Sequence, residues 1–141
     1  MLGASQNLMK KIKKAFISVS DKTHLNLILN SLRKYNIKII SSGGTHKRII
    51  KLGFKSTSVS EFTQFPEILS GRVKTLHPKI HAGILSRRNN FDNKQMQSLN
   101  FEEIDLVVVN FYPFERIVKN EKNIKKITEL IDIGGPSLTR A

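Results

Sequence analysis

Two turns of this 141-residue chain combine hydroxyl, ammonium and glycine groups directly after short apolar runs. Residues 18–22 (SVSDK) offer two hydroxyls and the Lys22 ammonium, and residues 41–45 (SSGGT) offer paired glycines with the hydroxyls of Ser42 and Thr45. Glycines let a backbone approach an anion closely, and N–H groups at a helix start attract phosphate. The two turns therefore indicate either one shared phosphate site or two ordinary turns, the first serving as an N-cap.

A basic stretch follows in the middle of the chain. In an extended segment Arg72 and Lys74 would point the same way, so that Arg72 could clamp an oxyanion and Lys74 could stabilise developing negative charge. The alternative is a solvated basic face. His77 and His81 have the spacing of a metal pair, but no further ligand stands near them, so helix capping and core packing are favoured.

Two more polar turns lie near the end of the chain. Asn110 and Tyr112 follow an apolar run and could contact the edge of a heterocycle, and Asp132 precedes two glycines whose N–H groups could serve a ligand. The alternatives are a core aromatic for Tyr112 and a helix N-cap for Asp132.

The elements that would position these turns form an alternating pattern. We expect buried strands at 15–19 and 37–40, a third strand at 56–59 and a central strand at 106–109, and the first three are separated by helices. That order predicts an α/β fold with a parallel sheet and right-handed crossovers, in which ligands bind beyond the carboxyl ends of the strands. The expected helices and turns are a helix after an N-cap at Ser20 or Asp21, a helix at 46–52, a polar surface helix within 87–100, helices at 115–118 and 124–130, and a turn at 131–136.

Composition narrows the possible classes. Hydrophobic residues make up 39% of the chain and cysteine is absent, which fits one ordinary domain and excludes disulfides and thiolate metal sites. No apolar run approaches the ~18 residues of a membrane span, so no membrane partner is expected. The lysines behind the net charge of +13 are spread over the whole length, so anionic small ligands are favoured and no specific nucleic-acid partner is expected.

Five runs together resemble a known family: SVSDK (18–22), SSGGT (41–45), FPEILSGRVKTLHPKIHAGIL (65–85), DLVVVNFYPFE (105–115) and IDIGGPSLTRA (131–141). They are similar to the N-terminal domain of the bifunctional purine-biosynthesis enzymes that couple AICAR formyltransferase to IMP cyclohydrolase. The SGGT turn is shared with a wider superfamily that includes methylglyoxal synthase. The resemblance implies a three-layer α/β/α fold with a central, mostly parallel sheet.

The resemblance also implies a reaction and its residues. 5-Formamidoimidazole-4-carboxamide ribonucleotide would lose water and close to IMP, with no cofactor and no metal. Lys74 and Tyr112 would act at the formyl oxygen and Asp132 in proton transfer. The residues expected to bind the substrate are Ser18, Ser20, Asp21, Lys22, Ser42, Gly43, Gly44, Thr45, Arg72, Thr75, Asn110, Gly134 and Gly135.

The same resemblance sets expectations for the whole protein. Residues 1–11 are expected to be a flexible basic extension and residues 12–141 the cyclohydrolase domain, truncated before a lysine that assists the family's proton transfer. The formyltransferase domain, which would use 10-formyltetrahydrofolate, is not in this sequence. We expect a cytoplasmic protein, homodimeric at full length. The alternatives are a methylglyoxal-synthase-like or regulatory phosphate-binding domain and a general polyanion-binding module.

Overall fold

A computed structural model describes residues 10–141; residues 1–9, most of the expected flexible extension, lie outside the described part. Its four strands are β1 (Lys14–Ser18), β2 (Lys38–Ser41), β3 (Thr57–Ser58) and β4 (Leu106–Val109). They pair in the order β3-β2-β1-β4, and every pairing is parallel. The predicted parallel sheet is confirmed.

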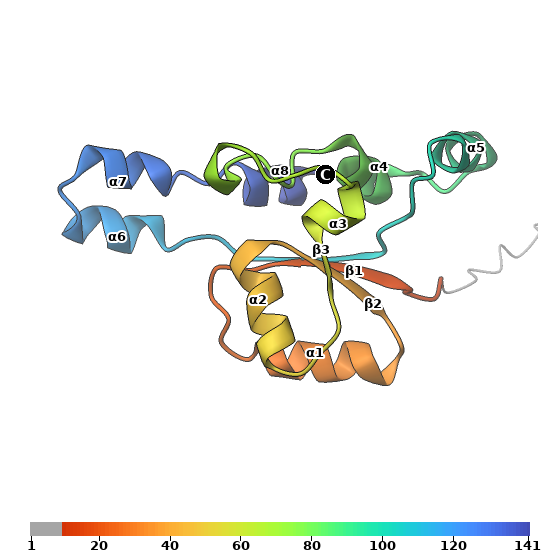
Figure 1. The fold of residues 1–141 in the computed structure, drawn as a ribbon, viewed down its shortest axis with the longest axis horizontal. Coiled ribbons are helices and arrows are strands. Elements are labelled where there is room, and N and C mark those ends of the chain that lie inside the picture. Colours follow the sequence, from red (N-terminus) through yellow and green to blue (C-terminus); the bar gives the residue numbers. More distant parts are fainter. Residues whose placement is uncertain (1–9) are drawn as a thin grey trace, which may run out of the picture.

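Helices cover both faces of the sheet (Figure 1). The helices α1 (Leu25–Lys34) and α2 (Gly43–Lys51) lie on one face, and α3 (Val59–Thr63), α4 (Pro78–Leu85) and α8 (Gly134–Arg140) lie on the other. The polar helix α5 (Asn90–Ser98) lies beyond α4. The predicted three-layer α/β/α arrangement is therefore confirmed.

The central strand β1 divides its side chains between two hydrophobic cores. Ala15 and Ile17 join the cluster beneath α1 and α2, whereas Phe16 packs with Ile80 and Leu138 on the opposite face. All five are at most 2% exposed. Successive strand residues point to opposite faces, so one strand anchors both helix layers and fixes where its own end lies.

Three local predictions are corrected. The first helix begins at Leu25, because the Asp21 carboxylate accepts hydrogen bonds from the N–H and hydroxyl of Thr23 and closes a separate turn. The helix α2 begins at Gly43 rather than at His46. The predicted turn at 131–136 ends in α8, which already begins at Gly134.

The segment after β4 extends away from the sheet. It contains α6 (Phe114–Asn120) and α7 (Ile124–Glu129), which Figure 1 shows joined by a short loop at the far end of the segment. The short 3-10 turn η1 (Leu69–Gly71) lies between α3 and α4. Within residues 10–141, every helix is too short or too polar to cross a bilayer.

Candidate functional site

A cavity of about 700 Å³ opens at the carboxyl ends of β1, β2 and β4. Its lining includes every residue predicted for the site except Asp21 and Gly43. Those lining residues are Ser18, Ser20, Lys22, Ser42, Gly44, Thr45, Arg72, Lys74, Thr75, Asn110, Tyr112, Asp132, Gly134 and Gly135. A second cavity of about 510 Å³ lies beside Phe54 and contains none of them. The sheet thus brings together residues that are far apart in the sequence, such as Ser18 and Gly135, which are 117 positions apart.

Two turns meet at one side of this cavity. The hydroxyls of Ser18 and Ser42 lie 3.0 Å apart, which joins the end of β1 to the start of α2. The Lys22 ammonium donates to the carbonyls of Val19 and Ser20, both at 3.1 Å. An ammonium has three protons, so one remains for a ligand. The Lys22 Nζ also lies 3.9 Å from where a Cβ of Gly44 would stand, so ammonium and helix start face one space.

Thr45 binds the protein itself rather than facing the cavity with a free hydroxyl. Its Oγ1 accepts from the Val19 N–H at 3.1 Å and donates to the Val19 carbonyl at 3.0 Å, and the residue is 3% exposed. The hydroxyl therefore has no proton left to donate to an anion. Thr45 instead ties the first turn of α2 to the end of β1.

Asn110 fixes the loop that carries Lys22. Its Oδ1 accepts from the N–H groups of Ser20 at 2.6 Å and Asp21 at 3.1 Å, and its Nδ2 donates to the Asp21 carbonyl at 2.9 Å. The amide thus spans from the end of β4 to the loop after β1. This side chain, predicted to contact a heterocycle, here has its amide engaged with the protein backbone.

Lys74 and Arg72 both line the cavity, but not for the predicted reason. Arg72 has helical backbone angles after η1, so the segment is not extended. The Lys74 Nζ lies 2.9 Å from the Cβ position of Gly43 and 3.2 Å from that of Gly71, which places its ammonium between two turns. The Arg72 guanidinium instead makes a two-bond ion pair with Glu129.

The opposite wall is formed by the start of α8. The Asp132 Oδ1 accepts from the Gly135 N–H at 3.1 Å, so this carboxylate binds the first turn of α8, although the N-cap position itself is Ile133 and not Asp132 as the alternative expected. Thr75, 6% exposed, has its hydroxyl 2.7 Å from the Cβ position of Gly134. Tyr112 lines the cavity and is 48% exposed.

His77 is the N-cap of α4 and His81 lies within this helix. His77 Nδ1 accepts from the Lys79 N–H at 3.1 Å, which confirms the predicted capping. Burial, with a smaller contribution from the Lys79 charge, lowers the pKa of His77 below its usual value. Between residues 10 and 141, no three histidine or carboxylate side chains gather as a metal site would require.

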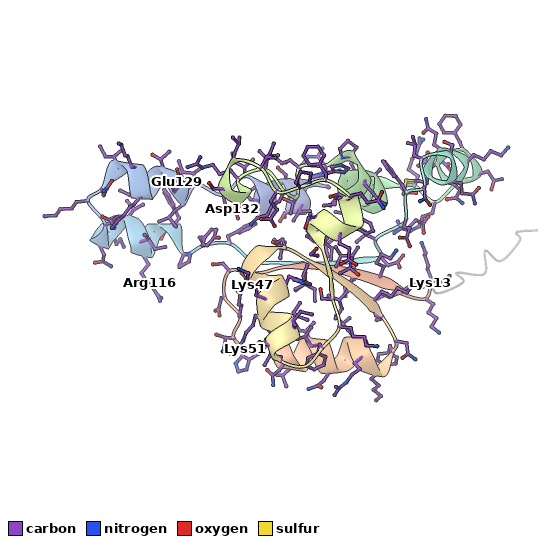
Figure 2. All side chains as sticks on the ribbon, viewed as in Figure 1. Lys13, Lys47, Lys51, Arg116, Glu129 and Asp132 are labelled. Atoms are coloured by element: carbon purple, nitrogen blue, oxygen red, sulfur yellow. The ribbon has the colours of Figure 1, made fainter. Side chains whose placement is uncertain are left out.

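Sequence reasoning missed one charged residue of the cavity wall, Glu129. It lies at the last position of α7, three residues before Asp132, and the hydrogen bond from Arg72 holds its pKa below the usual glutamate value. Its partner is 57 positions away in the chain, so no local pattern marks it. Figure 2 shows Glu129 at the end of α7 that faces the body of the domain, close to Asp132.

A family model described as the MGS-like domain matches residues 25–137, most of the sheet and the cavity wall. The chain belongs to the MGS-like domain family. The match covers α1 through the first half of α8, and it includes the segment that contains Arg72, Lys74 and Asp132.

Relatives within this family are long proteins with a shared name. The chain is 48% identical over 132 residues to the bifunctional purine biosynthesis protein PurH of Acetivibrio thermocellus, 49% over 131 residues to that of Wigglesworthia glossinidia brevipalpis, and 49% over 135 residues to that of Leptospira biflexa. These matches cover 92–94% of this chain but 24–26% of the relatives. The chain therefore spans about a quarter of the length of these relatives.

A solved structure shares the arrangement of this MGS-like domain. The crystal structure of ForH superposes with a TM-score of 0.79 at 27% sequence identity, covering 91% of this chain and 65% of that chain.

Proposed function

We propose that this MGS-like domain is an IMP cyclohydrolase, closing 5-formamidoimidazole-4-carboxamide ribonucleotide to IMP in purine biosynthesis. The observation that carries the proposal is one cavity in which phosphate-type turns and Lys74, Tyr112 and Asp132 face a common space. The identity of 48–49% to PurH proteins supports it, because their name assigns them to purine biosynthesis.

The reaction requires positioning of the substrate and proton transfer rather than a cofactor. The carboxamide nitrogen attacks the neighbouring formyl carbon, and one of its protons passes to the formyl oxygen. The resulting hydroxyl then leaves with the proton of the formamide nitrogen as water, and a C=N bond remains. Both reacting groups belong to one molecule, so the protein must hold the rotamer that brings them together and stabilise charge on oxygen.

Three residues are proposed for these tasks. The Lys74 ammonium, held between the turns at Gly43 and Gly71, would stabilise charge on the formyl oxygen together with the Tyr112 hydroxyl. The Asp132 carboxylate keeps one oxygen free of the Gly135 N–H, and that oxygen would accept a proton from nitrogen.

Other parts of the lining would hold the nucleotide. Lys22 and the first turn of α2 would bind the 5′-phosphate, because a helix start and an ammonium there face one space. Gly134 and Gly135 would lie under the base. The domain is proposed to need no cofactor and no metal for this step. Use of 10-formyltetrahydrofolate would belong to another part of the full-length protein, and that protein is proposed to be a cytoplasmic homodimer.

Ligand binding tests the proposal directly. IMP at about a hundredfold above its Kd should stabilise the folded chain by about 2.7 kcal/mol, a Tm rise of several degrees, by linkage to the folded state. Inosine, which lacks the phosphate, should raise the Tm far less. A Tm that millimolar IMP leaves unchanged would contradict the proposal.

Turnover tests the role of Lys74. In the full-length protein, with formation of the purine ring followed by absorbance, Lys74→Ala should lower the rate about 100-fold, the effect of removing one donor to a developing oxyanion. Lys47→Ala is the matched control, because this exposed lysine of α2 lies outside the cavity lining (Figure 2). Conversion of dihydroxyacetone phosphate to methylglyoxal in place of ring closure would favour the lyase alternative.

A further inference from the structure

The arm formed by residues 113–131 contains α6 and α7 and connects two proposed catalytic residues. Tyr112 precedes the arm and Asp132 follows it, and both line the cavity. Figure 1 shows the two helices extending away from the sheet. A shift of the arm would therefore act directly on Tyr112 and Asp132, the residues that flank it, and not on Lys74, which is held by other elements.

The arm packs weakly against the rest of the domain. Neither α6 nor α7 contains a buried residue, and Ile124 is 78% exposed. An element without buried apolar side chains has little to hold it in one place. A polar contact between the arm and the body of the domain therefore carries unusual weight.

One such contact is the ion pair of Arg72 with Glu129. The Arg72 Nε donates to Glu129 Oε2 at 2.8 Å, and Nη2 donates to Oε1, so the pair has the two-bond geometry of the strongest arginine–carboxylate contacts. Within the described residues, no other hydrogen bond or ion pair links a side chain of the arm to the domain outside residues 112–132.

The pair also lies where it can respond to a ligand. Both residues line the cavity, and their side chains are 59% and 53% exposed. An ion pair this exposed contributes little to stability, so the contact can open without unfolding the domain. The mutual attraction appears in the pKa values as well: the hydrogen bond to Glu129 raises the pKa of Arg72, and the same bond lowers that of Glu129.

We propose that Glu129 is a positioning residue, which clasps the arm to Arg72 and so holds Tyr112 and Asp132 against the ring of a bound purine nucleotide. This inference rests on the proposed function for the identity of the ligand. The clasp itself depends only on the contact between Glu129 and Arg72. Loss of the clasp should affect ligands that reach the arm and spare those that occupy only the turns around Lys22.

The arm offers a matched pair of variants. Glu129→Gln removes the charge of the clasp, whereas Glu121→Gln removes the same charge from a residue that pairs with Lys126 inside the arm. Neither glutamate is buried, and glutamine keeps the side-chain oxygen that Glu121 uses to accept from the Asn123 N–H, so neither change should disturb folding. Two readouts apply to both: affinity for IMP and for inorganic phosphate, and the rate of trypsin cleavage within the arm. The arm contains the trypsin sites Arg116, Lys119, Lys122, Lys125 and Lys126.

We expect Glu129→Gln to weaken IMP binding about fivefold, the most an exposed ion pair supplies, with phosphate affinity unchanged. Trypsin should cut its arm faster than that of wild type, and IMP should protect the arm less. Glu121→Gln should match wild type in both readouts. Equal behaviour of the two variants in cleavage, or equal losses of IMP and phosphate affinity in Glu129→Gln, would overturn the proposal. If wild type bound phosphate but not IMP, the proposed function would fail, and cleavage without ligand would still decide whether the clasp exists.

Discussion

The substitution Gly44→Ala should change nucleotide affinity and the stability of the fold in different ways. Gly44 is the second residue of α2, and an added Cβ would stand 3.9 Å from both Cε and Nζ of Lys22, in ordinary van der Waals contact. The methyl group would therefore fit the protein without strain. It would, however, occupy the space between the helix start and the ammonium, where we propose that the phosphate binds.

The substitution should raise the stability of the fold and lower the affinity for the phosphate. Alanine in place of glycine within a helix should stabilise the fold by about 0.5–1 kcal/mol, a Tm rise on the order of 3 °C. A phosphate oxygen that accepts from Lys22 lies about 2.8 Å from Nζ, so on the side toward α2 it would collide with the methyl group. Loss of one hydrogen bond to a charged group costs about 1.5–3 kcal/mol, or roughly 10- to 150-fold in Kd.

Isothermal titration with IMP and thermal unfolding measure the two effects separately. Gly53→Ala is the control with the reverse phenotype: Gly53 has φ +81°, so a side chain there costs about 1–2 kcal/mol of stability. Gly53 lies outside the proposed nucleotide cavity, so the Gly53→Ala variant should bind IMP as tightly as wild type. If Gly44→Ala bound IMP as tightly as wild type, the phosphate could not lie at the start of α2.

Two further predictions concern residues that support the site. Asn110→Ala should cost about 2 kcal/mol, because three hydrogen bonds to the loop after β1 are lost, and should weaken phosphate binding through a displaced Lys22; an unchanged urea midpoint would refute this. His77→Asn should make the free energy of unfolding less dependent on pH. Burial lowers the pKa of His77 in the folded state, so as the pH falls below about 6.5 the unfolded state takes up the proton first. The wild type therefore loses stability until the pH has passed the lowered pKa of the folded state. Asparagine keeps the cap of α4 without titrating, and an equal loss of stability in wild type and variant between pH 7 and pH 5, with His24→Asn as the exposed control, would contradict the assignment.

The positions of β1 and β4 could be predicted from their apolar runs, although β4 was expected to be a central strand and is a half-buried strand at the edge of the sheet. Residues 15–19 and 106–109 are short, apolar and bounded by turns, and β1 and β4 lie within one residue of those bounds. Helix starts were harder. Asp21 has the chemistry of an N-cap, but the same carboxylate can close a local turn, and here it bonds to Thr23 instead.

The site was predictable as a set of turns but not as a set of contacts. Parallel strands bring their carboxyl ends to one edge, so the convergence of the turns at Lys22 and Thr45 follows from topology. The pairing of Arg72 with Glu129 depends on the direction in which the arm leaves the sheet, and short-range spacing does not encode that direction. The helices predicted at 115–118 and 124–130 are confirmed as α6 and α7, yet their lack of buried residues became visible only in the fold.

The central claim is that one mononucleotide spans the cavity from the start of α2 to the start of α8. A titration of the ¹⁵N-labelled chain with IMP, followed by amide chemical shifts, tests it most directly. The account predicts that the amides of Lys22, Gly44, Thr75 and Gly134 shift together with a single Kd, and that inorganic phosphate shifts only the first two. Shifts confined to the second cavity beside Phe54, or separate Kd values for the two walls, would contradict it.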